Sequence, residues 1–270
     1  MVARGMVLAG LALVGLGALG AGASAKRAEA AVKTEVVEYR HGDVVLEGYL
    51  AYDDAQPGKR PGVAVFHAWR GHDEYVRGRA RQLAEQGYVA FAADMYGKGV
   101  RAKDHVEAGK LSGAFRADRE LMRARAGASV ERLRAHPRVD ATRIAAIGYC
   151  FGGTAVLELA RSGADLAAVV SFHGALDTPH PEKSKPKARI LVCHGADDPH
   201  VPPERVAAFA DEMRRAKADW ELIQYGGAVH SFTEREAGSD PTKGVAYHER
   251  ADRRSWESML SLFEEAFEAP

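Results

Sequence analysis

The stretch Gly148-Tyr149-Cys150-Phe151-Gly152-Gly153 decides the fold, because of what lies on each side of it. The apolar run at residues 143–147 predicts a buried strand before it, and residues 154–160 predict a helix after it. A cysteine flanked by glycines, between a strand and a helix, is typical of a nucleophile held on a strained turn. The glycines are needed because side chains would keep the helix from returning close to the strand. The pattern also fits a glycine-rich turn around a buried, inert cysteine.

The proposed turn would place Cys150 where its chemistry can be used. At a helix N-terminus, the partial positive charge of the backbone favours a thiolate. The backbone N–H of Phe151, the next residue, would point at the same place and could stabilise an oxyanion.

Short apolar runs alternate with charged stretches of helical period along the rest of the chain. Two hairpin strands are predicted at 33–39 and 44–52, turning at His41-Gly42-Asp43. Further strands are expected at 62–66, 88–93, 143–148, 166–172, 189–193 and 220–225, and helices at 73–86, 122–135, 202–216 and 245–267. This alternation predicts one α/β domain over residues 26–270, with a mostly parallel sheet covered on both faces. Residues 97–115 are irregular, and we interpret them as a candidate lid.

Two further residues follow predicted strands and complete a catalytic constellation. Asp198 lies after the strand at 189–193, and we favour it over Asp197 because of its spacing from Val201-Pro202. His230 lies on the loop after the strand at 220–225. The chain order nucleophile, acid, histidine is that of α/β-hydrolases. The sequence therefore predicts a triad of Cys150, Asp198 and His230, although the aspartates could also cap the helix near Pro202 and His230 could be a surface residue.

Composition excludes several classes of protein. The 37 Lys and Arg residues balance 37 Asp and Glu residues, so we expect no nucleic-acid partner held by a basic surface. A hydrophobic fraction of 46% is too high for a disordered chain. Two cysteines are too few for a disulfide scaffold or a Cys-rich zinc site.

The N-terminus has the features of a secretory signal peptide. A basic start precedes an apolar run at 6–23, which ends in Ala23-Ser24-Ala25. We expect residues 1–25 to be removed after Ala25 and the mature protein to be exported to the periplasm or the medium, without stable membrane association. The alternative is an uncleaved anchor. Five glycines in the run and its length, at the short end of the roughly 17–25 residues that a span needs, favour cleavage.

Together these motifs resemble the dienelactone hydrolase family, whose members are single-domain α/β-hydrolases with a Cys-His-Asp triad. The resemblance covers residues 36–267 and rests on G-Y-C-F-G-G at 148–153, G-A-D-D-P-H-V-P at 195–202 and V-H-S-F at 229–232. Gln86-Gly87-Tyr88 and Asp94-Met95-Tyr96 support it. The resemblance implies cleavage of a small-molecule ester or lactone. We expect no cofactor, and we favour a monomer although the sequence does not fix the oligomeric state. It also implies an oxyanion hole formed by the backbone N–H groups of Phe151 and Trp69.

Two departures from the family pattern bear on the substrate. Family members that open dienelactone carry a Glu that contacts the resting thiol, and Ala68 stands at that position here. The arginine that binds the substrate carboxylate in the family is replaced by Glu234, with Arg235 beside it. A carboxylate repels a carboxylate substrate, so dienelactone itself is not favoured. A compensating arginine could be supplied by one of three candidates, which are Arg70, Arg116 and Arg119.

Other interpretations remain open at this stage. The same triad would serve a thioesterase or a peptidase, because fold and triad do not specify a substrate. A degenerate exported binding protein could also keep the turn. A redox role for Cys150 would require a resolving cysteine, and none lies near it in the sequence. We interpret Cys193 as a core residue. We expect no metal, because His67, His173 and His194 show no metal-binding spacing. We expect these histidines to line the pocket or to satisfy backbone groups.

Overall fold

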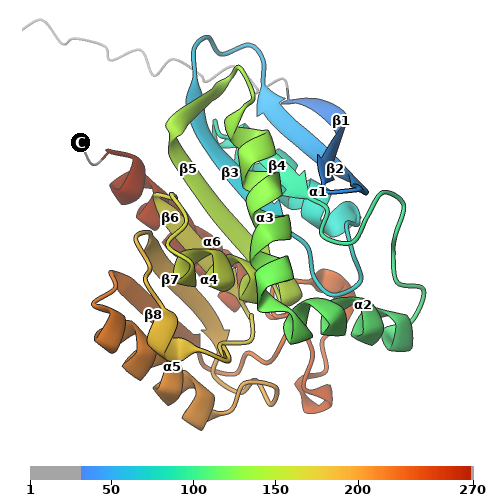
Figure 1. Cartoon of the computed structure of the whole chain (residues 1–270). Coiled ribbons are helices and arrows are strands. Elements are labelled where there is room, and N and C mark those ends of the chain that lie inside the picture. The colour runs from blue at the N-terminus through green and yellow to red at the C-terminus, as the bar shows by residue number, and fades with distance from the viewer. Residues whose placement is uncertain (1–31, 269–270) are drawn as a thin grey trace, which may run out of the picture.

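The computed structural model describes residues 32–268, and the expected signal peptide at residues 1–25 lies outside this range. An eight-stranded sheet crosses the molecule in the order β1-β2-β4-β3-β5-β6-β7-β8 (Figure 1). The strands are β1 Val32–His41, β2 Val44–Asp53, β3 Arg60–Phe66, β4 Val89–Ala93, β5 Val139–Tyr149, β6 Ala168–Phe172, β7 Arg189–Gly195 and β8 Trp220–Tyr225. β2 pairs antiparallel with β1 and β4, and the other neighbouring strands are parallel. The predicted sheet is confirmed, with the predicted hairpin at one edge.

Helices cover both faces of this sheet. They are α1 Glu74–Glu85, α2 His105–Ala117, α3 Arg119–Arg134, α4 Phe151–Arg161, α5 Pro203–Ala216 and α6 Glu249–Glu268. Side chains of β3 alternate between the faces: Ala64 and Phe66 join a core with α3, α4 and α5, whereas Val63 and Val65 join a core with α1 and α6. Two buried faces explain why the central strands are apolar without interruption. None of the helices within residues 32–268 is long and apolar enough to cross a membrane.

The region expected to be irregular is partly helical. Residues 97–104 form turns and loops, but α2 begins at His105, and the side chain of Asp104 accepts a hydrogen bond from the Glu107 N–H at the N-cap. Asp118 then ends α2 and caps α3, which starts three residues before the predicted helix at 122–135. The weak apolar pattern of α2, whose buried residues are Ala108, Ser112 and Phe115, explains why its period was missed.

The last helix starts later than predicted. The sequence pattern extends from residue 245, whereas α6 begins at Glu249. Val245 instead forms a parallel β-bridge with His230. The segment before α6 is therefore extended because it pairs with the loop that carries the candidate base.

Candidate active site

Cys150 alone makes the turn between β5 and α4. Its φ of 52° lies in the left-handed region, which residues other than glycine seldom adopt. The adjacent glycines have no room for side chains. A Cβ on Gly148 would lie 2.1 Å from the Gly152 carbonyl oxygen, and one on Gly152 would lie 2.3 Å from the Phe66 carbonyl oxygen. The predicted sharp turn is present, and it holds Cys150 at the N-terminus of α4, where the helix carries partial positive charge.

A hydrogen-bonded row joins the three residues predicted for the triad. His230 Nε2 lies 3.1 Å from Cys150 Sγ, and His230 Nδ1 lies 2.8 Å from Asp198 Oδ2. The residues follow β5, β7 and β8, which end at the same edge of the sheet. Cys150 is 8% exposed and Asp198 is 4% exposed, so water screens this row weakly. The order thiol, imidazole, carboxylate is that of an activated nucleophile with its base and orienting acid.

The structure separates the two neighbouring aspartates. Asp198 accepts hydrogen bonds from the His200 N–H and from His230, whereas Asp197 is exposed and accepts from the Gly227 N–H. Asp198, favoured from its spacing to Val201-Pro202, is therefore the aspartate that contacts the histidine. Neither aspartate makes a side-chain cap at the start of α5, whose N-cap residue is Pro202.

Charge in this row favours a proton on the imidazole. Burial opposes protonation of His230, but the Cys150 sulfur and the Asp198 carboxylate outweigh burial and raise the pKa of His230 to about 10. Burial also opposes ionisation of Asp198, but its hydrogen bond and charge interaction with His230 leave the pKa of Asp198 below its usual range. The environment thus stabilises an imidazolium between two acidic partners.

The two residues predicted for the oxyanion hole lie on different elements. Phe151 is the first residue of α4, and Trp69 lies on the loop after β3. Within residues 32–268 no hydrogen-bond acceptor occupies the N–H of either residue. Tyr96 donates a hydrogen bond of 2.9 Å to the Trp69 carbonyl oxygen, which fixes the orientation of that loop. The Trp69 ring packs against the ring of His105, with 5.4 Å between the ring centroids.

The two departures from the family pattern have visible structural consequences. Ala68 is buried and brings no carboxylate toward Cys150, whose sulfur already faces His230. Glu234 follows the His230 loop, and its buried Oε1 has no hydrogen-bond partner among the described residues. Burial raises the pKa of Glu234 to about 7, the negative charge of Asp73 adds to the rise, and His230 opposes it. Glu234 is therefore an acidic group close to the candidate base.

The candidate compensating arginines are placed differently. Arg119 forms an ion pair with Asp177 at 3.4 Å. Burial and then the charge of Cys150 raise the pKa of Tyr96, and the Arg116 cation opposes this rise. Arg116 is exposed on α2, and its charge acts on the Tyr96 phenol. Arg235 instead packs over the Tyr247 ring at 4.7 Å.

The three buried histidines near the strand ends differ in their contacts. His67 bonds the Ala68 carbonyl oxygen through Nδ1 and accepts from the Met95 N–H through Nε2. His173 accepts from the Cys150 N–H. These two satisfy backbone groups, as predicted. Burial lowers the pKa of His194, which neighbours the Asp198 and His230 charges. Within residues 32–268 no group of three His, Cys, Asp or Glu side chains could hold a metal ion.

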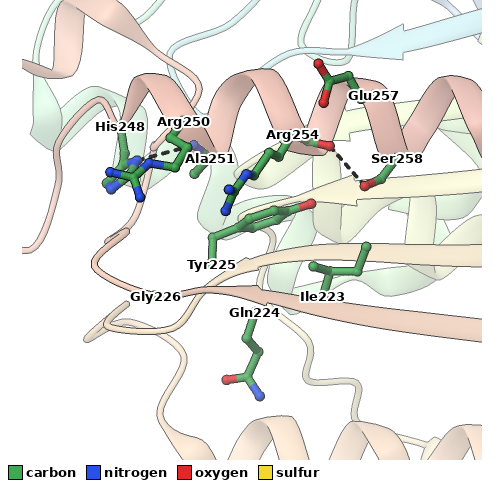
Figure 2. Close-up of a pocket in the computed structure, with 10 residues that line it drawn as sticks. All are labelled: Ile223, Gln224, Tyr225, Gly226, His248, Arg250, Ala251, Arg254, Glu257 and Ser258. Atoms are coloured by element: carbon green, nitrogen blue, oxygen red, sulfur yellow. Dashed lines mark hydrogen bonds between the residues drawn. The ribbon is translucent and has the colours of Figure 1, made fainter.

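Two cavities lie away from the triad. One of about 390 Å³ opens between the end of β8 and α6, where Figure 2 shows the Arg254 side chain above the Tyr225 ring. The other, of about 630 Å³, lies between α1 and α6 and is lined by Arg79, Asp252 and Trp256 among others. Neither is lined by Cys150, Asp198 or His230. Neither cavity therefore marks the candidate active site.

Known proteins show the same fold. The family model described as "Dienelactone hydrolase family" matches residues 46–267. The chain belongs to the dienelactone hydrolase family. As a member, it is a hydrolase that acts on ester or lactone bonds.

Several dienelactone hydrolase relatives align over most of their length. A Bradyrhizobium protein named as a probable 2-oxo-3-(5-oxofuran-2-ylidene)propanoate lactonase is 31% identical over 79% of this chain and 88% of its own. The solved structure of m3DLH is 44% identical, with a TM-score of 0.84, over 87% of this chain and 99% of its own. A dienelactone hydrolase-like promiscuous phosphotriesterase from metagenomic libraries is 41% identical, with a TM-score of 0.81, over 87% and 98%.

Sequence reasoning missed residues that support the triad from behind. Thr233 hydrogen-bonds His173 at 2.8 Å and Tyr75 at 2.7 Å, and Arg79 donates to Tyr75 at 3.1 Å. Thr233 and Tyr75 are 158 positions apart, so no local sequence pattern predicts their contact. The signal available in the sequence was the nearness of Thr233 to His230.

Proposed function

We propose that this dienelactone hydrolase family member cleaves a carboxylic ester or lactone through a Cys150–His230–Asp198 triad and an acyl-enzyme. The observation that carries the proposal is the buried row in which His230 Nε2 lies 3.1 Å from Cys150 Sγ and Nδ1 lies 2.8 Å from Asp198 Oδ2. A thiol in contact with a histidine that a carboxylate orients is the arrangement of covalent catalysis by cysteine. The same triad could serve a thioester or another acyl substrate.

In the first half of the proposed reaction, the Cys150 thiol proton resides on His230, and the thiolate attacks the substrate carbonyl carbon. A C–S bond forms while the C=O π electrons move to the oxygen, which faces the N–H groups of Phe151 and Trp69. Collapse of this intermediate breaks the C–O bond. His230 donates its proton to the leaving oxygen, and a thioester remains on Cys150.

In the second half, His230 accepts a proton from water as the water attacks the thioester carbonyl carbon. The second tetrahedral intermediate uses the same N–H groups. Its collapse breaks the C–S bond, releases the carboxylic acid and restores the thiolate–imidazolium pair. Asp198 stays ionised throughout and holds His230 in position.

We further propose that the substrate brings no carboxylate to the Glu234 side of the site. Glu234 stands where the family binds a carboxylate through arginine, and two like charges at close range in a buried site repel. Glu234→Arg should therefore raise kcat/KM for an ester with a free carboxylate relative to its neutral analogue. A ratio equal to that of the native enzyme would contradict this assignment.

The proposed nucleophile is tested by hydrolysis of p-nitrophenyl esters of increasing acyl length. Cys150→Ala should lose turnover. Cys193→Ala is a matched control, because Cys193 is fully buried and burial raises the pKa of its thiol to about 12. Full turnover by Cys150→Ala would contradict the proposal. The substrate panel includes a thioester and a phosphotriester, because one relative is a promiscuous phosphotriesterase.

A further inference from the structure

A chain of buried hydrogen bonds runs from the Cys150 backbone away from the triad. The Cys150 N–H donates to His173 Nδ1 at 3.2 Å, in addition to the Phe172 carbonyl oxygen at 3.0 Å. His173 Nε2 lies 2.8 Å from Thr233 Oγ1, which lies 2.7 Å from Tyr75 Oη. These contacts link the turn that carries the nucleophile to the loop that carries His230.

The direction of each hydrogen bond can be worked out. Because His173 Nδ1 accepts from a backbone N–H, its proton lies on Nε2 and is donated to Thr233 Oγ1. The Thr233 hydroxyl is then free to donate to Tyr75 Oη, and the Tyr75 hydroxyl donates to the Thr233 carbonyl oxygen at 3.3 Å. Arg79 Nε donates to Tyr75 Oη at 3.1 Å and completes its shell. In this arrangement every polar hydrogen along this row of hydrogen bonds has an acceptor, so His173 is held in one neutral tautomer.

Arg79 fixes the end of this row of hydrogen bonds that lies farthest from Cys150. Arg79 also donates to the Thr233 carbonyl oxygen at 3.1 Å and forms a salt bridge with Asp252 on α6. Both Thr233 and Arg79 are buried. The network therefore connects α1, α6 and the His230 loop to the back of the nucleophile turn.

His173 is also in contact with the candidate base. Its ring lies 5.4 Å from that of His230, in an edge-on arrangement, and its φ of 41° lies in the left-handed region. A second positive charge here would oppose the imidazolium. Burial, then the charges of His230 and Arg79, hold the pKa of His173 well below its usual range. The titratable or charged groups around His173 are Cys150, His230, Arg79, His194, Tyr149 and Tyr75.

We infer that His173 and Thr233 are positioning residues, which hold the Cys150 turn against His230 and keep a neutral ring beside the imidazolium. The inference rests on the proposed function and adds to it two residues outside the triad that hold the Cys150 turn in place. Neither residue touches the reacting atoms. Their effect is exerted through the position of the Cys150 sulfur and the protonation of His230.

The test compares matched variants by the rate at which iodoacetamide alkylates Cys150 as a function of pH. Thr233→Val keeps the shape of the side chain but removes the hydroxyl, whereas Thr233→Ser keeps the hydroxyl. We expect Thr233→Val to lower the alkylation rate near neutral pH by about 10²-fold, because a sulfur displaced from His230 is less often a thiolate. At alkaline pH the rates should converge, because a thiol then ionises without help from His230. Thr233→Ser should retain most of the native rate and profile.

A second pair makes the test independent of Thr233. His173→Asn offers an oxygen to the Cys150 N–H and tolerates the positive φ, whereas His173→Ala offers neither. The alanine variant should show the shifted pH profile, and the asparagine variant should partly rescue it. His136→Ala serves as the control, because this ring packs against Tyr52, away from the site. Cooperative thermal unfolding verifies that each variant is folded.

The outcomes separate this inference from the proposed function. Folded Thr233→Val and His173→Ala variants that alkylate with the native pH profile would overturn the positioning role. If instead native Cys150 reacts no faster near neutral pH than an ordinary thiol, the proposed nucleophile is itself wrong, and the inference falls with it. Fast native labelling with a shift confined to the disruptive variants supports both.

Discussion

His230 and Val245 form an isolated parallel β-bridge that holds the histidine loop from its far side. The His230 N–H donates to the Gly244 carbonyl oxygen at 3.2 Å, and the Ala246 N–H donates to the His230 carbonyl oxygen at 3.1 Å. The backbone of the candidate base is thus fixed by two hydrogen bonds, and its ring by Asp198. The segment before α6 contributes to the site without supplying a side chain to it.

Removing one of these backbone bonds should impair catalysis. Ala246→Pro deletes the N–H that reaches the His230 carbonyl oxygen, and we expect kcat to fall by about 10²-fold because the imidazole loses its position. Val245→Pro is the matched control, because no hydrogen bond of the Val245 N–H is present among the described residues. Steady-state kinetics on both variants checks this. Equal losses would show that proline at either position acts by general disruption.

The close approach at the nucleophile turn predicts a sharp difference between two glycines. Gly152→Ala should destabilise the protein by about 1–3 kcal/mol or more, because its Cβ would lie 2.3 Å from backbone that cannot move freely. Gly127→Ala should instead stabilise it by about 0.5–1 kcal/mol, because Gly127 lies inside α3 with nothing within 4 Å of the new Cβ. Urea unfolding measures both. A stable Gly152→Ala variant would mean that the turn is looser than described.

Glu234 should make stability depend on pH. Its pKa is raised from 4.5 to about 7, so the folded protein binds this proton more tightly than the unfolded chain. The stability associated with the proton is fully present below the unfolded pKa and is lost as pH rises through the folded pKa. Glu234→Gln removes the buried charge. Its free energy of unfolding should exceed that of the native protein by roughly 1–3 kcal/mol above pH ~7, but not at acidic pH.

Denaturant unfolding of the two proteins across this pH range checks the prediction. Glu236→Gln is a suitable control, because Glu236 is exposed on the same loop. A stability difference between native protein and Glu234→Gln that stays constant with pH would exclude a strongly raised pKa at Glu234.

The N-terminal pattern makes a prediction about processing. When the full chain is expressed in a host with a secretory pathway, the mature protein should begin at or within a few residues of Lys26. N-terminal sequencing of the exported protein gives the answer. A protein that keeps Met1 and fractionates with membranes would favour the anchor instead.

Much of this fold was predictable because its signals are local. Each proposed triad residue lies within five residues of the end of a strand. The carboxyl ends of parallel strands share one edge, so chain order sufficed to bring Cys150, Asp198 and His230 together. The predicted hairpin and central strands match β1 to β8, with ends that differ by a few residues. The glycines on either side of Cys150 predict a strained turn, and the close contacts at Gly148 and Gly152 agree with that prediction.

The rest depends on contacts between distant segments. The start of α6 is set by the pairing of Val245 with His230, which the helical period of residues 245–267 does not contain. α2 has a weak apolar face, so its cap at Asp104 was the main local signal. The hydrogen-bond network between His173 and Asp252 joins side chains of α1, α6 and two loops, and no spacing within the sequence predicts these contacts.

The most direct test of the account is to detect the acyl-enzyme. Native protein mixed with p-nitrophenyl acetate and acid-quenched during turnover should carry one acetyl group, located on Cys150 by peptide mass spectrometry. Cys193→Ala should acquire the same label, and Cys150→Ala should acquire none. Turnover with no acetyl group on Cys150, or the same turnover in Cys150→Ala, would contradict the claim that this cysteine is the nucleophile.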